Sequence, residues 1–413
     1  MRLERRRYGS HPVRLAGEPP MNDWDDDLPF GLPFTLEEYE QRIARTKAAM
    51  AEAGIDLLMV TSPENIYWLT GYRTTGYYVY QIFLLPLDGT PQFVTSKLEH
   101  ECVRALSWIK TGLTVFMGED EVAKTLEGFD ATEARIERIG YEERGFWLPP
   151  RILDAVRGRW GNTATVAAGH VLEDLRRIKS PAEISCLREA ARIASVGMRA
   201  GLQAVAPGRT ENEVAGDVYQ ALMAEGGEHP AGGPYVVTGP RAAITHMLPE
   251  RAVIEPGHAV YFEVGGCYKR YSGSNMRMAH VGPPGNEAAH RAATSIEALD
   301  AMLETIKPGA TSQDIDRAGR SVMARGGTTE EFRHRAGYSM GVAFAPGWGE
   351  GLVNDIAEGN ERPLEPGMAF HLVPMAGFRG EGNMGFSETV LVSTDGCEVL
   401  TDVPRELHIV SAG

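Results

Sequence analysis

Residues 254–282, IEPGHAVYFEVGGCYKRYSGSNMRMAHVG, contain two strand-like runs in succession. A Pro-Gly turn precedes the first run, residues 259–263, which is β-branched and aromatic. The glycine pair 265–266 interrupts this run, where a bulge or a hairpin needs conformational freedom at φ. The second run covers residues 268–281. The stretch therefore predicts a β-hairpin with a carboxylate, Glu263, at the end of its first strand.

A second copy of this pattern follows further along the chain. The stretch LEPGMAFHLVPM (364–375) has the same Glu-Pro-Gly-x-Ala start as the first copy. APGRTENEV (206–214) precedes the first copy and KPGATSQDI (307–315) the second, and each opens an amphipathic helix that ends in a glycine pair. Self-similarity at a spacing of about 100 residues predicts two helix-plus-hairpin halves. We expect a pseudo-twofold relation that places the two hairpins face to face around one central site.

The duplicated layout and these motifs resemble the creatinase/prolidase/methionine-aminopeptidase family, whose catalytic domain has the pita-bread fold. The resemblance covers roughly residues 35–410, because the amino-terminal half also resembles the creatinase-type accessory domain. It implies an α/β N-terminal creatinase-like domain followed by an α+β pita-bread domain with an internal pseudo-twofold. The expected parts are an N-terminal arm (1–33), the creatinase-like domain (34–175) and the catalytic domain (176–413).

The metal ligands of that family are largely missing from this sequence. Most members hydrolyse peptides with two metal ions held by two Asp, one His and two Glu. The resemblance places these five positions on Glu263, Ser274, Tyr338, Val373 and Glu388. Ser, Tyr and Val supply neither charge nor a good lone pair, and two carboxylates without an imidazole cannot hold a two-metal cluster. We therefore expect this protein to retain the fold of the family, to have lost its two metal ions and to use no cofactor.

Size and composition exclude several classes of partner. With 413 residues, 43% of them hydrophobic, the chain is long enough for two domains. A net charge of −15 disfavours nucleic acid or an anionic membrane as a partner. The four cysteines form no C-x-x-C pair, so neither a disulfide framework nor a zinc site is expected. No apolar run approaches about 18 residues and no secretory signal is evident, which predicts a cytoplasmic protein without a membrane span.

His246 lies one short loop before the strand that carries Glu263. Imidazole is the group best suited to move a proton near pH 7. The resemblance implies the same role, because creatinase, a metal-free member, has a histidine at the corresponding place as its proton carrier. The competing interpretation is a surface or hydrogen-bonded loop histidine.

Glu263 and Glu388 come from the two halves and are expected to converge on the central site. Two close carboxylates without a metal repel each other, so one must be protonated or a cation must lie between them. An amidine, guanidinium or ammonium group of a substrate would satisfy both carboxylates with charge-assisted bonds. The competing interpretation is that Glu263 binds the backbone of the bulge and Glu388 is a vestige.

Tyr338 takes the place of the family's metal-site histidine. A phenol there is expected to donate a hydrogen bond to a developing oxyanion, and the competing interpretation is a space-filling core residue. His371 precedes Val373 by two residues, so strand alternation puts both on one face. If the family layout holds, that face is directed to the site, and we expect His371 to bind substrate.

Among metal-free relatives, the ectoine hydrolases match best. The matching segments are Phe262–Tyr271, Gly337-Tyr338, Pro346–Glu350, Gly367–His371 and Val403–Arg405. After the WLTGY stretch, Arg73 stands where these enzymes carry an acidic and aromatic loop, and an arginine favours a substrate carboxylate or phosphate. Creatinase uses an arginine of this domain across a dimer, so a homodimer is implied in which the N-terminal domain contributes to its partner's site. Tyr77 of the same loop is expected to help bind substrate. The competing interpretation of Arg73 is a solvated charge on a loop.

These observations favour a metal-independent hydrolase of a non-peptide C–N bond in a small amidine, guanidino or lactam acid. The proposed catalytic residues are His246, Glu263, Glu388 and Tyr338, and the proposed substrate-binding residues are Arg73, Tyr77 and His371. One alternative is a metal-dependent Xaa-Pro dipeptidase or aminopeptidase, the function that resemblance of fold alone suggests. Others are a non-catalytic pita-bread binding protein and, as an outlier, a metal-dependent lyase.

Overall fold

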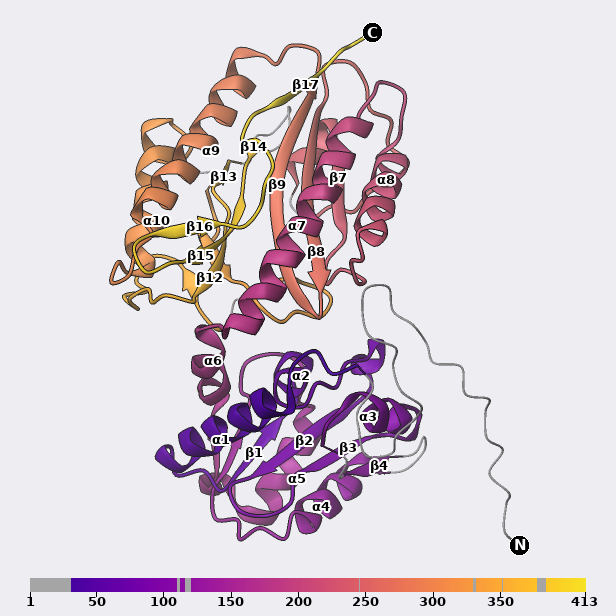
Figure 1. Ribbon diagram of the computed structural model, residues 1–413, viewed down its shortest axis with the longest axis vertical. Helices are drawn as coiled ribbons and strands as arrows, with labels where there is room; N and C mark the ends of the chain where they lie inside the picture. The colour runs from indigo at the N-terminus through magenta and orange to yellow at the C-terminus, as the bar shows by residue number, and fades with distance from the viewer. Residues whose placement is uncertain are drawn as a thin grey trace, which may run out of the picture. The chain divides into compact units, whose positions relative to one another are not determined.

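The computed structural model divides into two compact units, one ending at Leu172 and the other beginning at Glu173 (Figure 1). The sequence placed this boundary between residues 175 and 176. The arm expected at 1–33 lies outside the described residues except for its last three. Within the described part, every helix is too short or too polar to cross a bilayer. The structure describes residues 31–109, 112–115, 120–244, 246–329, 332–350, 352–376 and 384–413.

The N-terminal unit is a mixed β-sheet with helices packed against it. In sheet order its strands are β4 (Leu113–Val115), β3 (Gln92–Ser96), β2 (Gln81–Pro86), β1 (Leu57–Val60), β5 (Ile139–Tyr141) and β6 (Thr165–Ala167). Its helices are α1 (Leu36–Glu52), α2 (Pro63–Thr70), α3 (His100–Leu106), α4 (Glu121–Ala131) and α5 (Pro150–Trp160), with 3-10 turns η1 (Thr75–Tyr78), η2 (Lys97–Glu99) and η3 (Asn162–Ala164). The central strand β1 is buried along its whole length, as its continuous apolar run predicts. The expected α/β domain is confirmed.

The C-terminal unit contains two larger sheets and a short ribbon. The first sheet is β17 (His408–Val410), β9 (Tyr271–Val281), β8 (Ala259–Tyr268) and β7 (Pro234–Thr238). The second is β11 (Asp355–Ile356), β10 (Gly337–Ser339), β12 (Ala369–Leu372), β15 (Glu388–Val392) and β16 (Cys397–Val399), and the ribbon is β13 (Met375–Ala376) with β14 (Met384–Gly385). The helices are α7 (Pro181–Ala204), α8 (Glu211–Ala224), α9 (Asn286–Thr305) and α10 (Ser312–Arg325), with the 3-10 turn η4 (Gly239–Ala243). Helix α6 (Gly169–Arg177) contains the boundary between the two units. Helix α7 lies across β8 and β9 (Figure 1).

The predicted internal pseudo-twofold is confirmed by matching backbone contacts in the two halves. Helices α8 and α10 both begin with a threonine capping box. The turn before α8 is tied to the segment that enters β8 by a 2.9 Å bond from Gly208 N to Ile254 O. The turn before α10 is tied to the segment that enters β12 by a 2.9 Å bond from Gly309 N to Leu364 O. Each half therefore docks the start of its helix against the start of its central strand in the same way.

The β8–β9 hairpin differs from the prediction in the role of its glycine pair. Strand β8 continues through both glycines without a bulge, and Gly266 pairs with Gly273 of β9. A Cβ atom on Gly266 would clash with the carbonyl oxygen of Ala190 in α7, and one on Gly273 would lie 2.6 Å from the Cα atom of Ala191. These glycines therefore permit the close passage of α7 over the hairpin, and the predicted break in the strand was wrong.

The turn of this hairpin is made by two residues with side chains. Lys269 and Arg270 have φ angles of 48° and 61°, in the left-handed region that a two-residue hairpin turn requires. The carboxylate of Glu228 accepts hydrogen bonds from both backbone N–H groups, at 3.1 and 3.0 Å. These contacts offset the strain of two non-glycine residues with positive φ.

A buried ionic cluster holds the end of α6 and the link to α7 against the loop after β10. The carboxylate of Glu350 accepts a bond of 2.9 Å from Lys179 Nζ, a close bond from Arg176 and one of 3.0 Å from Val342 N. Burial alone would raise the pKa of Glu350, but Arg176 and Lys179 bring it below its usual value. The carboxylate is therefore ionised in the folded protein and neutralises two buried cations.

Replacing Glu350 with glutamine removes the carboxylate charge that faces the buried Arg176 and Lys179. We expect a loss of about 3–5 kcal/mol in unfolding free energy near neutral pH, measured by urea unfolding. Because the folded pKa is lowered, this stabilisation is fully present above the unfolded pKa of about 4.3 and is lost as pH falls through the folded value. The difference between wild type and variant should therefore shrink in acid.

The matched control is Glu398→Gln, which breaks an exposed pair between Glu398 and Arg188. Exposed pairs contribute about 1 kcal/mol or less, so this variant should unfold much like the wild type. Equal losses for the two variants would contradict the anchoring role of Glu350.

Candidate active site

Glu263 lies on the face of β8 that is directed toward the second half of the C-terminal unit. Phe262 and Val264 point the other way and pack in the core beneath α7 and α8. Tyr261, on the same face as Glu263, donates its hydroxyl proton to Glu263 Oε2 at 2.7 Å. Burial raises the pKa of Glu263 to about 7, although the bond from Tyr261 lowers it. Near neutral pH this carboxyl group is therefore present in both protonation states.

Aromatic side chains gather around this carboxylate. Tyr235 on β7 stands directly opposite Glu263 in the strand register. The ring of Trp348 lies 5.5 Å from that of Tyr235, edge to face, and packs over Gly265, where a Cβ atom would come within 2.7 Å of the indole. Tyr338 is close enough that burial and then the charge of Glu263 raise its pKa. A carboxylate among aromatic faces is a suitable environment for an organic cation.

A chain of hydrogen bonds runs behind Tyr338. Trp348 Nε1 donates to the Tyr338 hydroxyl at 2.9 Å, and that hydroxyl is 2.8 Å from His371 Nδ1. His371 Nε2 is 2.6 Å from Ser387 Oγ. The imidazole is 0% exposed, and burial lowers the pKa of His371 to about 3, so the ring is neutral. The prediction that His371 binds substrate was wrong, because both ring nitrogens are occupied by protein groups.

The direction of the side chains on β15 decides which of its residues faces the site. A β-bridge pairs Ser387 with Met276 of β9, and Met276 stands opposite Glu263 in the hairpin. Ser387 is therefore on the face of Glu263, and the following residue, Glu388, points to the other face. Glu263 and Glu388 therefore do not converge on the site as expected. The sequence comparison placed the last ligand position on Glu388, whereas the strand register places it one residue earlier, on Ser387.

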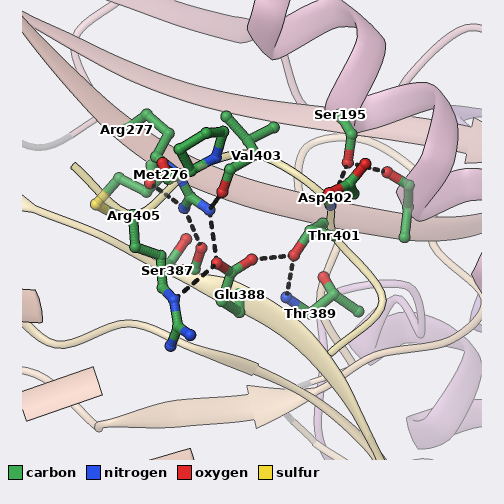
Figure 2. Close-up of polar contacts among 12 residues, drawn as sticks. Ser195, Met276, Arg277, Ser387, Glu388, Thr389, Thr401, Asp402, Val403 and Arg405 are labelled. Atoms are coloured by element: carbon green, nitrogen blue, oxygen red, sulfur yellow. Dashed lines mark hydrogen bonds and ion pairs between the residues drawn. The ribbon is translucent and has the colours of Figure 1, made fainter. Parts of the chain in front are cut away.

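Glu388 is instead part of a buried ion pair (Figure 2). Its Oε1 atom accepts a bond of 2.6 Å from Arg277 Nη2, and its Oε2 atom accepts a close bond from the Thr401 hydroxyl. Burial raises the pKa of Glu388, and Arg277 opposes that rise. Since a guanidinium keeps its charge in proteins, we assign this contact as a salt bridge that joins β9 to β15.

His246 is exposed and has a φ angle of 62°. Its ring lies 6.5 Å from the ring of Tyr235, the residue opposite Glu263. A second histidine, which the sequence reasoning missed, lies nearby: burial, Arg320, Arg335 and His246 together lower the pKa of His334. His334 precedes Tyr338 by four residues, but no repeat or motif drew attention to it.

The two remaining predicted residues belong to the N-terminal unit. The guanidinium of Arg73 donates to the carbonyl oxygens of Gly31 and Gly71, at 3.0 and 3.5 Å. Tyr77, in η1, packs edge to face against Trp147 with ring centroids 5.5 Å apart. Both side chains therefore have partners within their own unit, and their contact with substrate stays a prediction.

The side chains on the site face do not fit a pair of metal ions. When β15 is aligned by the direction of its side chains, the five ligand positions of the family carry one carboxylate and four groups that bind hard cations poorly. These residues are Glu263, Ser274, Tyr338, Val373 and Ser387. Across the described ranges, no three His, Cys, Asp or Glu side chains are grouped so that they could hold a metal ion.

Comparison with known proteins agrees with the fold. The family model "Metallopeptidase family M24" matches residues 185–394, and "Creatinase/Prolidase N-terminal domain" matches residues 42–178. The chain is 28% identical to the ectoine hydrolase of Halomonas elongata over 92% of this chain and 98% of that protein. It is 30% identical to the probable dipeptidase PepE of Mycobacterium tuberculosis over 91% of this chain and 98% of that protein.

Solved structures show the same relation. The dipeptidase PepE of Mycobacterium ulcerans superposes with a TM-score of 0.78 at 28% identity, covering 92% of this chain and 99% of that one. The prolidase of Pyrococcus horikoshii superposes with a TM-score of 0.76 at 25% identity, covering 89% and 99%. Together with the two domain matches, these similarities show that the chain belongs to metallopeptidase family M24 and is a hydrolase of that family.

Proposed function

We propose that this protein hydrolyses a non-peptide C–N bond in a small amidine, guanidino or lactam acid, without a metal cofactor. The observation that carries the proposal is the donor set of the site: one carboxylate, Glu263, with neutral side chains at the other four ligand positions. Such a set binds hard cations poorly, but it suits an organic cation that brings its own charge. The similarity to an ectoine hydrolase is consistent with this class of substrate.

Recognition of the substrate divides into two charged contacts. Glu263 takes the cationic C–N group, and the faces of Tyr235 and Trp348 add cation–π attraction. Arg73, supplied by the N-terminal domain of a partner subunit in a homodimer, takes the carboxylate of the substrate as a bidentate pair. This arrangement selects small zwitterions over peptides.

The chemistry requires addition of water and loss of an amine. The water oxygen bonds to the amidine carbon, and a base takes one proton from that water. Glu263 is one candidate base, because burial raises its pKa to about 7. His246 is the other, because imidazole is a suitable general base and its ring lies 6.5 Å from that of Tyr235, the residue opposite Glu263. Tyr338 donates a hydrogen bond to the oxygen of the tetrahedral intermediate. The C–N bond then breaks, and the leaving nitrogen takes up the proton that the base received from the water.

A second candidate function is metal-dependent cleavage of Xaa-Pro dipeptides. It is favoured by the 25% identity and TM-score of 0.76 with the prolidase of Pyrococcus horikoshii. The donor set argues against it, because Ser274, Val373 and Ser387 cannot replace carboxylates as ligands of two metal ions.

The two functions are separated by assays with and without a chelator. We expect ectoine, creatine or a related cationic C–N acid to be hydrolysed at the same rate after dialysis against EDTA, and Xaa-Pro dipeptides to be left intact. The measurement is amine release, with metal content determined on the same sample. Activity that is lost with chelator and restored by Mn²⁺ would defeat the proposal.

The pH dependence tests the role of Glu263. Since the ionised carboxylate binds the cation, kcat/KM should rise with pH through a midpoint of about 7, the pKa of Glu263 in the free enzyme. The Tyr261→Phe variant removes the hydrogen bond that lowers this pKa, so the midpoint should move to higher pH. Glu263→Gln should remove this limb and reduce kcat/KM by at least about 100-fold.

The control for this series is Tyr219→Phe, a change at an exposed tyrosine of α8. This variant should keep the wild-type midpoint. If Tyr261→Phe also keeps it, the group that titrates is not Glu263.

A further inference from the structure

Ser387, His371 and Tyr338 form a chain of three polar side chains that the proposed reaction uses only at its Tyr338 end. Ser387 Oγ and the Tyr338 hydroxyl bond to the two opposite nitrogens of the His371 ring, at 2.6 and 2.8 Å. Ser387 and His371 are both 0% exposed. Neither can touch a substrate directly, so any contribution to catalysis must pass through Tyr338.

A neutral imidazole carries one proton, which allows two arrangements of this chain. In the first, Ser387 O–H donates to Nε2, and Nδ1–H donates to the Tyr338 oxygen. In the second, Tyr338 O–H donates to Nδ1, and Nε2–H donates to Ser387 Oγ. The two arrangements differ in where the Tyr338 proton points: away from His371 in the first, and toward it in the second.

The surroundings of Ser387 favour the first arrangement. In the second, the Ser387 hydroxyl proton needs another acceptor, and within the described ranges Ser387 Oγ is hydrogen-bonded to His371 alone. A buried donor without an acceptor is costly, so the serine proton is better placed on Nε2.

The first arrangement also completes the bonding of Tyr338. Its oxygen then accepts from His371 Nδ1–H and from Trp348 Nε1–H, which uses both lone pairs. The guanidinium of Arg335 lies 4.6 Å from the centre of the phenol ring and helps to fix it. The hydroxyl proton is then directed away from both His371 and Trp348, and it is free to bond to a group in the site.

We propose that Ser387 and His371 are positioning residues that set the histidine tautomer and thereby aim the Tyr338 hydroxyl as a hydrogen-bond donor at the reacting oxygen. The proposal rests on the proposed function for the oxygen that receives this bond, while the tautomer itself is independent of any substrate. No proton is transferred along the chain. The Nδ1–H group of His371 and the Nε1–H group of Trp348 stabilise the negative charge that Tyr338 shares with the intermediate.

The first test is the tautomer of His371 in the free protein, read by heteronuclear NMR of isotope-labelled histidine ring nitrogens. The His371→Gln spectrum identifies the signals of this ring by their absence. We expect a protonated Nδ1 and an unprotonated Nε2 that do not titrate around neutral pH. A proton on Nε2 in the wild type would overturn the proposal, whatever the protein hydrolyses.

The second test is Ser387→Ala, which removes the donor to Nε2. We expect the His371 proton to move partly or fully to Nε2. The value of kcat should fall by at least about tenfold with little change in KM, because the Tyr338 ring keeps its position while its hydroxyl proton no longer points at the reacting oxygen. Ser387→Thr restores a hydroxyl and should recover both the tautomer and kcat. An unchanged tautomer, or a loss that appears only in KM, would contradict the role of Ser387.

Ser195→Ala is the matched control. This serine of α7 is also buried, and its hydroxyl bonds only to backbone atoms in the described structure, Ala191 O and Asp402 N. The variant should lose stability to a similar degree in thermal unfolding while keeping the tautomer and kcat. If Ser195→Ala lowered kcat as much as Ser387→Ala, the effect would be one of stability and the positioning role would be rejected.

Discussion

One buried guanidinium determines how the two halves of the C-terminal unit meet. All three guanidinium nitrogens of Arg277 donate hydrogen bonds. Four of these bonds go to backbone carbonyl oxygens and one goes to the carboxylate of Glu388. Two of these carbonyls belong to Met276 and Ser387, the residues that form the bridge between β9 and β15. A buried guanidinium without a counter-charge is strongly destabilising. The pair with Glu388 therefore fixes the register of the two strands, and this register decides that Ser387 faces Glu263.

In the part of the chain that the structure describes, the carboxylate of Glu263 has no cation as a hydrogen-bond or ion-pair partner. Its hydrogen-bond partner among the described residues is the neutral phenol of Tyr261. Its raised pKa is the direct consequence, since burial penalises a carboxylate that is not compensated. A ligand that brings a positive charge relieves this penalty on binding. The same physical property thus accounts for the titration near neutral pH and for the preference for a cationic substrate.

Much of the fold could be predicted because its signals are local and occur twice. Capping residues, Pro-Gly turns and β-branched runs repeat in both halves, so the pseudo-twofold was visible in the sequence. The errors concern contacts between distant segments. The need for Gly266 arises from the passage of α7, and the direction of Glu388 arises from Arg277 on another strand. A shift of one residue along a strand reverses every side chain, and no local pattern reports it.

The order of Ser387 and Glu388 also decides the chemistry of the histidine behind the site. A carboxylate at position 387 would accept from His371 Nε2 and favour the imidazolium. It would also place a second negative charge on the face of Glu263, where a positive ion would be needed to hold both. The serine hydroxyl instead leaves the buried ring neutral, as the low pKa of His371 requires. The position of the proton on the His371 ring, and not a change in its charge, then controls the direction of the Tyr338 hydroxyl. The carboxylate of Glu388 instead pairs with Arg277 and helps to fix the strand register.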